Sequence, residues 1–333
     1  MEGKEDSGTG DRRACRRRGP DRFPAHQGLR GRDNAMFLEP SMRLIAGVGS
    51  LVIAAALPAA AANAEWDAVA KAIGRPGMEM PGGVYRVAIG RSDLAVTLDG
   101  VPIKPALALG SYLAFHKAGK EAMVMGDLVL LPEEVNPVMK KLIEQGIQVT
   151  AIHNHLLRAT PQIMYMHYEG HGDAAKLAAA VRTALQESKT PLEAPAKAGA
   201  QPAIDLDQAA IEKALGAKAT PNGGVLQFSI ARTEAIKEHG MALPPAMGMG
   251  IAINFQPTSG GKAAITGDFV LTAKEVNPVL KTLRDNGIEV TALHSHMLDE
   301  QPRLFFMHFW ANDDAQKLAD GLKAALRKVS LQK

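Results

Sequence analysis

Cysteine is almost absent from this sequence, and Cys15 is the only one among 333 residues. After residue 15 the chain therefore has no disulfide partner, no thiolate metal ligand and no cysteine nucleophile. The motifs G-x-S-x-G, G-x-G-x-x-G and H-E-x-x-H and the phosphate-binding P-loop are missing too. The sequence thus gives no support for serine-hydrolase, nucleotide-binding or zincin chemistry.

A membrane-spanning apolar run is also lacking, because residues 44–57 are apolar for only 14 residues and a span needs about 20. Instead, residues 42–64 have the features of a signal peptide: Arg43 precedes the apolar run, and Ala62-Asn63-Ala64 is an A-x-A cleavage site. Residues 1–41 are rich in Arg and Gly and predict a disordered arm or a start codon assigned too early. We expect cleavage after Ala64, a periplasmic or secreted protein, and no lipid anchor at the cleavage point.

An excess of positive charge is missing from the chain after residue 64. Residues 1–64 hold 10 of the 38 Lys and Arg and 7 of the 35 Asp and Glu, which leaves 28 residues of each sign. A protein that neutralises many phosphates needs a basic surface. We therefore expect no nucleic-acid partner, and the string His153-Asn154-His155 lacks the surrounding motif of an HNH nuclease.

An internal repeat is the main feature that the sequence does contain. The segment "GDLVLLPEEVNPVMKKLIEQGIQVTA" (126–151) returns as "GDFVLTAKEVNPVLKTLRDNGIEVTA" (267–292), an offset of 141 residues. Each copy has the size of an ordinary domain. The predicted organisation is a leader (1–64), a first repeat domain (65–188), a linker rich in Pro and Ala (189–205) and a second repeat domain (206–333).

The patterns within each copy predict an α+β fold: two tandem homologous repeats, each an antiparallel sheet with helices packed on one face. The next helix after the strand that carries "GDLVL" starts at Asn136-Pro137, or one turn earlier, as the capping box Thr272-x-x-Glu275 of the second copy indicates. The expected elements of the first copy are a helix (66–73), strands near 84–90, 106–116 and 121–131, a helix ending at Gly146, strands 147–157 and 162–169, and a helix (173–187).

Three histidines recur with the repeat. The first triad is His153, His155 and His167, and the second is His294, His296 and His308. If the two strands form a hairpin with a three-residue loop, His153 lies opposite His167, and alternation places His155 on the same face. Three imidazoles so spaced can converge on one ion with bonds of about 2.0–2.1 Å. We therefore predict a metal site within each hairpin. The alternative is a polar cluster at a domain interface, in which the histidines are structural.

Other polar residues have weaker signals. Glu169 shares the histidine face in the first copy only, as a possible fourth ligand or proton acceptor. Asp127 and Asp268, in the repeated Gly-Asp, indicate a bulge more than a carboxylate that orients a ligand. Arg91 and Arg232 indicate solvated charges more than an anion site. We favour zinc over copper, although paired methionines would suit copper.

The strings "VTAIHNHLL…MYMHYEGHGDAAKLA" and "VTALHSHML…FFMHFWANDDAQKLA" resemble the secreted bacterial LppY/LpqO family, a domain family of unknown function. The resemblance covers nearly all of the chain after residue 64 and implies an exported bacterial protein. We predict metal binding or metal-assisted hydrolysis, in which zinc lowers the pKa of bound water to about 7. The alternative is a periplasmic interaction or small-ligand-binding module.

Overall fold

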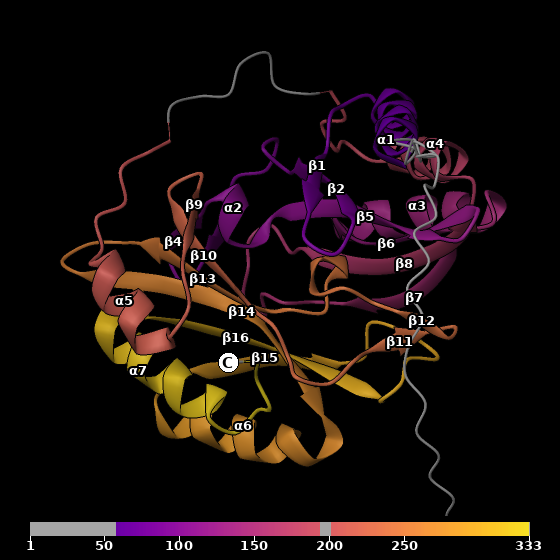
Figure 1. Cartoon of the computed structure of the whole chain (residues 1–333). Coiled ribbons are helices and arrows are strands. Elements are labelled where there is room, and N and C mark those ends of the chain that lie inside the picture. Colours follow the sequence, from indigo (N-terminus) through magenta and orange to yellow (C-terminus); the bar gives the residue numbers. More distant parts are fainter. Residues whose placement is uncertain (1–57, 194–200, 333) are drawn as a thin grey trace, which may run out of the picture. The chain divides into compact units, whose positions relative to one another are not determined.

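Two six-stranded antiparallel sheets form the framework of the chain (Figure 1). The computed structural model describes residues 58–193 and 201–332. The strand order is β1-β2-β5-β6-β8-β7 in the first sheet and β9-β10-β13-β14-β16-β15 in the second, so equivalent strands occupy equivalent places. The predicted α+β class with two similar repeats is confirmed. Most of the predicted leader (1–57) and part of the predicted linker (194–200) lie outside the described residues.

The elements of each repeat follow in chain order. The first repeat contains α1 (Pro58–Ile73), β1 (Met78–Met80), β2 (Val84–Gly90), β3 (Val96–Leu98), β4 (Val101–Ile103), α2 (Pro105–Ala108), β5 (Gly110–Ala118), β6 (Glu121–Leu130), α3 (Pro132–Glu144), β7 (Gln148–His153), β8 (Met164–Gly172) and α4 (Ala174–Leu185). The second repeat contains α5 (Gln208–Leu215), β9 (Thr220–Asn222), β10 (Val225–Ile230), β11 (Lys237–Glu238), β12 (Met241–Ala242), the 3₁₀ turn η1 (Pro245–Met247), β13 (Ile251–Pro257), β14 (Lys262–Thr272), α6 (Ala273–Asp285), β15 (Glu289–His294), β16 (Leu304–Asp314) and α7 (Ala315–Leu326). No helix of the described residues is long and apolar enough to cross a membrane.

The equivalent helices α3 and α6 both begin one turn before their Asn-Pro pair. The Glu134 carboxylate accepts a hydrogen bond from the Leu131 amide at 2.8 Å, and Glu275 accepts one from the Thr272 amide at 2.7 Å. These acidic side chains satisfy a backbone donor that the helix itself leaves free. The capping-box interpretation is thus correct, and the proposed helix start at Asn136-Pro137 is wrong.

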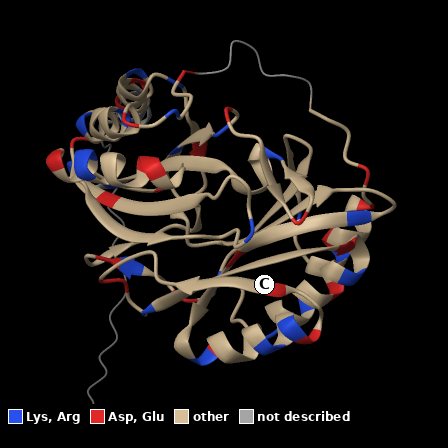
Figure 2. Cartoon of the chain, turned by 180° about the vertical axis from the view of Figure 1, so that it is seen from behind, with Lys and Arg blue, Asp and Glu red and all other residues tan. Residues whose placement is uncertain are grey.

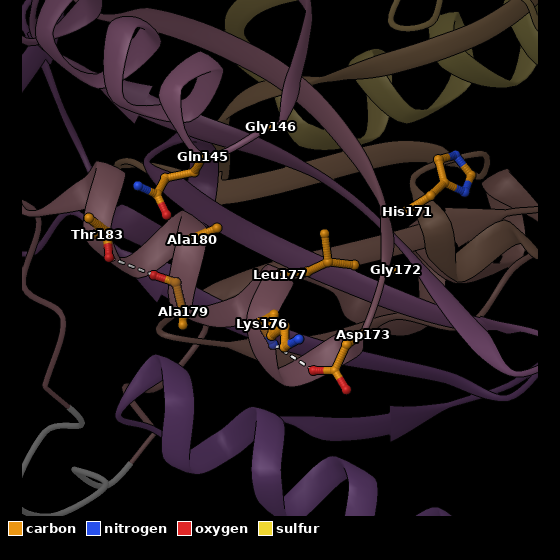
Figure 3. A pocket seen from close by; sticks show the side chains of 10 residues that line it. All are labelled: Gln145, Gly146, His171, Gly172, Asp173, Lys176, Leu177, Ala179, Ala180 and Thr183. Atoms are coloured by element: carbon orange, nitrogen blue, oxygen red, sulfur yellow. Dashed lines mark hydrogen bonds between the residues drawn. The ribbon is translucent and has the colours of Figure 1, made fainter.

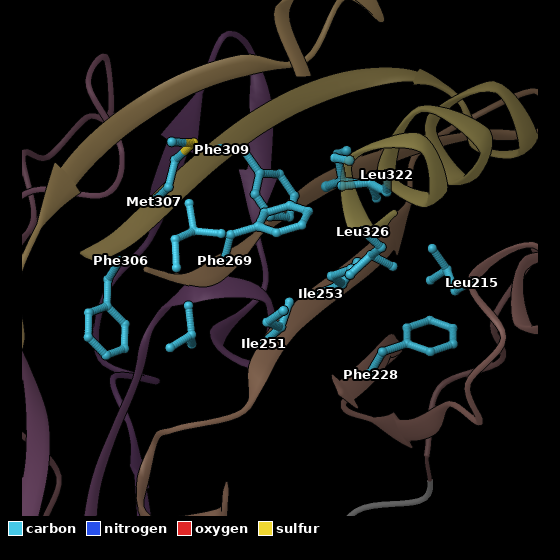
Figure 4. Packing of buried hydrophobic residues seen from close by; sticks show 14 of the residues in the cluster. Leu215, Phe228, Ile251, Ile253, Phe269, Phe306, Met307, Phe309, Leu322 and Leu326 are labelled. Carbon is cyan, nitrogen blue, oxygen red and sulfur yellow. The ribbon is translucent and has the colours of Figure 1, made fainter. Parts of the chain in front are cut away.

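The helices cover the outer face of each sheet, and the inner faces of the two sheets meet (Figure 1). In the first repeat, Met166 packs beneath α3 and α4. In the second, Phe269 and Phe309 pack against Leu322 of α7 (Figure 4). Inner-face residues of the first sheet, such as Met125, join the core of the second repeat. The face of each sheet that turns away from its helices is therefore buried as well.

Many charged residues lie on the helices and connecting loops (Figure 2). Two arginines are buried. Arg91 is fully buried and donates to Glu134 at 2.7 Å and to the Val129 carbonyl at 2.9 Å. Arg232 repeats this arrangement with Glu275 at 2.9 Å. These arginines tie a strand end to a helix start, so the expectation that they are solvated is wrong.

Candidate metal centre

The hairpin that carries the first triad has a different register from the predicted one. The connection between β7 and β8 spans residues 154–163 and not three residues. His153 lies opposite Tyr165, not opposite His167. Because the register moves by an even number of residues, His153 and His167 still share the inner face. His155 lies in the connection just after β7.

Long-range backbone bonds hold this connection in place. The amide of Thr160 donates to the carbonyl of Thr97 and the amide of Thr97 donates to the carbonyl of Thr160, both at 2.9 Å. Gln301 and Lys237 make the same pair of bonds in the second repeat, at 2.8 and 2.9 Å. Each connection is therefore anchored to the small hairpin β3–β4 or β11–β12 of its own repeat.

The six predicted ligand histidines form one cluster between the repeats, not two separate triads. Their rings stack in pairs across the interface, with 3.6 Å between centroids in each pair: His153 with His294, His155 with His308, and His167 with His296. We call these residues the six-histidine cluster. The expectation that each hairpin holds its own site is wrong, because each imidazole of one repeat packs on an imidazole of the other.

The stacking follows a pseudo-twofold relation between the repeats. His153 and His294 are equivalent positions, so their stack lies on the pseudo-twofold axis. The other two stacks are equivalent to each other, and each continues into an aromatic ring. The ring centroids of Tyr165 and His155 are 3.5 Å apart, and those of Phe306 and His296 are 3.4 Å apart. Duplication has therefore produced one symmetric centre.

Ring nitrogens of the cluster lie close enough to bind a common ion. The Nε2 atoms of His153 and His155 are 2.7 Å apart, and those of His294 and His308 are 2.9 Å apart. Metal–nitrogen bonds of about 2.0–2.1 Å place neighbouring ligand nitrogens roughly 3 Å apart. Donor atoms of His153, His294, His296 and His308 all lie within 4.8 Å of one another. A ligand set drawn from both repeats therefore fits one ion.

Two glycines help to orient the imidazoles. His308 Nδ1 lies 3.0 Å from the carbonyl oxygen of Gly267, and His167 makes a backbone hydrogen bond with the equivalent Gly126. A proton on Nδ1 that is donated in this way leaves Nε2 free for a metal. A Cβ at Gly267 would lie 2.0 Å from the carbonyl oxygen of Ala252, so the close strand packing requires glycine here.

The aspartates of the repeated Gly-Asp border the cluster. The strand ladders continue in register through both, so the bulge interpretation is wrong. Asp127 lies 3.9 Å from His167 Nε2, and Asp268 lies 3.6 Å from His296 Nε2. Burial raises the pKa of Asp127 to about 8, and burial together with the nearby Asp127 raises the pKa of Asp268 well above its usual range.

The imidazoles of the cluster are held in the neutral form. Burial, with repulsion from His294, lowers the pKa of His167 to about 3, and burial lowers the pKa of His294 to about 4. Burial and repulsion from neighbouring imidazoles lower the pKa of the other four well below the usual value: His153, His155, His296 and His308. Neutral imidazole is the form that binds metal.

Several donor atoms of this centre have no hydrogen-bond partner among the described residues. They include Nε2 of His167 and His296 and Oδ1 of Asp127 and Asp268, all of which are buried. A buried polar atom without a partner costs about 1–3 kcal/mol. A divalent ion bound by these atoms would remove that cost, so the residues present fit a metal.

Glu169, the predicted fourth ligand or proton acceptor, has a different partner. Its carboxylate lies 3.0 Å from Nε2 of His239, and the two residues group with His171 and not with the six-histidine cluster. His239, in the turn of the β11–β12 hairpin, is a candidate that the sequence reasoning missed. Its equivalent in the first repeat is not a histidine, so the repeat gave no signal for it.

Two surface clefts lie outside the cluster. One is formed by the end of α3 and by α4, from Gln145 to Thr183, with His171 at its edge (Figure 3). The other runs along β7 and includes Ile152 and Leu298. Neither cleft is lined by a residue of the six-histidine cluster, so neither leads a substrate directly onto those imidazoles.

Comparisons with known proteins identify a family but no activity. The family model described as Domain of Unknown Function (DUF1259) matches residues 67–187 and again residues 209–328. A trimeric bacterial microcompartment shell protein, PduB, is 14% identical over 74% of this chain and 88% of its own, with a TM-score of 0.17. EtuB from Clostridium kluyveri is 10% identical over 74% and 89%, also with a TM-score of 0.17. Similarity this low carries no argument. The comparison with curated proteins found no match.

Proposed function

Because the chain belongs to the DUF1259 family in both repeats, and that family name assigns no activity, we propose a function from the centre itself: the protein binds one divalent transition-metal ion between its repeats. The ligands come from the six-histidine cluster, with His153 and His294 on the pseudo-twofold axis. The supporting observation is the stacking of six neutral imidazoles in partly or fully buried positions, in which Nε2 of His167 and of His296 has no hydrogen-bond partner among the described residues.

The chemistry of the donors supports zinc over copper. Neutral imidazole and carboxylate are good ligands for Zn²⁺, and Cu²⁺ also accepts imidazole. A copper site would gain from a methionine sulfur, but Met123 and Met125 belong to the apolar core. The ring stacking leaves the ion surrounded by side chains, which suits retention of metal more than turnover of a bound substrate.

Metal-assisted hydrolysis is the less favoured candidate. A catalytic ion keeps an open position for water, and the acid that we expected to accept a proton, Glu169, lies beside His239. We also propose that the protein acts in the periplasm or outside the cell, because residues 42–64 have the features of a signal peptide. This placement agrees with the resemblance to the secreted LppY/LpqO family.

The test uses the full chain, stripped of metal with a chelator and then titrated with Zn²⁺ in competition with a chromophoric chelator. We expect His294→Ala to abolish tight binding at this centre. His116→Ala is the matched control, because His116 belongs to none of the candidate metal-binding groups. Unchanged tight Zn²⁺ binding by His294→Ala, or no binding by the unsubstituted chain, would contradict the proposal.

A further inference from the structure

A second group of ionisable residues lies on the same inner face, further along β8. Glu169 and His171 belong to β8, and His239 lies in the β11–β12 turn of the other repeat. Their donor atoms lie within 4.8 Å of one another. The same holds for a second trio that shares His239 and adds Glu238 and Asp299. His239 is therefore common to two overlapping groups of possible ligands.

Two of the carboxylates are buried and incompletely paired. Glu169 is 1% exposed and Glu238 is 0% exposed. Oε1 of Glu169 faces His239, and Oε1 of Glu238 accepts a 3.3 Å hydrogen bond from the Asp299 amide. Oε2 of each carboxylate has no hydrogen-bond partner among the described residues. Within residues 58–193 and 201–332, no lysine or arginine forms an ion pair with Glu169, Glu238 or Asp299.

The duplicated fold has two equivalent corners between the repeats. The group around His239 is the second corner, and the first corner, around Arg158, contains a cation. There Arg158 donates to the carboxylate of Asp99 at 2.8 Å and to that of Glu289 at 2.6 Å, and it joins the two repeats. Trp310 Nε1 also donates to Asp99, at 3.0 Å. The guanidinium thus neutralises the carboxylates of this corner.

The second corner has different residues at the positions that are equivalent to those of the first corner. Asp299 stands where the first repeat has Arg158, and Glu169 stands where the second repeat has Trp310. His239 takes the place of Asp99, with the same positive φ of 49° in the hairpin turn. This corner has therefore lost its guanidinium and gained carboxylates and imidazoles.

We propose that this second corner binds a divalent first-row cation, held by Glu169, His171 and His239, with the overlapping trio of Glu238, His239 and Asp299 beside it. The ion takes the place that the guanidinium of Arg158 has at the first corner. Mixed carboxylate and imidazole ligands suit Mn²⁺, Fe²⁺ or Zn²⁺, and the donor set contains no sulfur that would favour Cu⁺. This site is separate from the six-histidine cluster and does not depend on it.

The test is Mn²⁺ binding by the full chain after addition of one equivalent of Zn²⁺, which the six-histidine cluster takes up, and binding is measured as loss of the electron paramagnetic resonance signal of free Mn²⁺. The unsubstituted chain should bind one Mn²⁺, and His239→Asn and Asp299→Arg should each weaken binding at least tenfold. Asn tolerates the positive φ of position 239. Asp299→Arg restores the guanidinium of the other corner on an exposed loop.

Two controls separate this proposal from that for the main centre. His116→Ala should bind Mn²⁺ like the unsubstituted chain, and His294→Ala should keep the Mn²⁺ site while it loses the Zn²⁺ centre. Circular dichroism establishes that each variant is folded. Mn²⁺ affinity that is unchanged in folded His239→Asn and Asp299→Arg, or no Mn²⁺ bound by the unsubstituted chain at about 1 mM, would overturn the assignment.

Discussion

Metal-free protein should lose stability steeply between about pH 6.5 and pH 4, because unfolding exposes the imidazoles of the six-histidine cluster to protons. Their pKa values are lowered in the folded state, to about 4 for His294 and about 3 for His167. In the unfolded chain the reference pKa of His is about 6.5. The folded state thus binds fewer protons in this window, and stability falls as pH falls.

The aspartates of the centre oppose this effect. Their pKa is raised by burial, to about 8 for Asp127, so in the same window they bind protons in the folded state and not in the unfolded one. Two aspartates offset two of the six histidines, which leaves a net uptake of about four protons on unfolding. At roughly 1.4 kcal/mol per proton and pH unit, stability should change by roughly 5 kcal/mol per unit at the steepest point.

Urea unfolding, followed by circular dichroism at pH 7, 6 and 5 in the presence of a chelator, measures this slope. Because domains are typically stable by about 5–15 kcal/mol, we expect the midpoint to collapse before pH 5. Zinc should shift the transition to lower pH, since the ion competes with protons for the same nitrogens. Equal midpoints at pH 7 and pH 5 in the metal-free protein would refute the idea that these imidazoles are buried and neutral.

Local sequence patterns predicted most of the fold. Apolar and β-branched residues located β2 and β6, and the capping box Thr272-x-x-Glu275 offered the correct start of α6 beside a wrong one. The repeat itself predicted that both halves have one strand order. These features depend on contacts within a few residues or within one sheet, which a sequence displays directly.

The register of the histidine hairpin could not be predicted in the same way. A short connection between β7 and β8 is the default for neighbouring antiparallel strands. Here Thr160 instead bonds to Thr97, 63 residues earlier, and this long-range contact sets the length of the connection. No pattern near the histidines reveals that partner.

The meeting of the two triads was also beyond local reasoning, because a repeat does not state how its copies pack. One signal was present. The sequence of β6 from Ala122 to Leu130 is apolar on both faces apart from Asp127, and a strand that is apolar on both faces must be covered on both. Helices cover one face, so the histidine face also needed a cover, and the second repeat supplies it.

The remaining predictions concern single positions. His153→Ala should remove the single ion of the six-histidine cluster, because the ring of His153 stacks on that of His294. Elemental analysis after gel filtration measures the bound metal. An ion that the second repeat still binds with full affinity would refute this prediction. Gly267→Ala should lower the free energy of unfolding by about 1–3 kcal/mol through overpacking against Ala252, whereas Gly90→Ala, which has room, should not. Glu134→Gln should cost about 1–3 kcal/mol, because it removes one of the two carboxylates that pair with the buried Arg91 and leaves Asp93. Finally, the free energy of unfolding of metal-free Asp127→Asn, minus that of the metal-free unsubstituted chain, should increase as pH rises. The native carboxyl has a pKa of about 8 when folded and about 3.9 when unfolded, so its contribution to stability declines from pH 4 to pH 8, and Asn has no such dependence. The difference between the two urea-unfolding free energies should therefore grow by roughly 1.4 kcal/mol per pH unit between pH 5 and pH 7, and a constant difference would show that Asp127 is ionised in the folded protein.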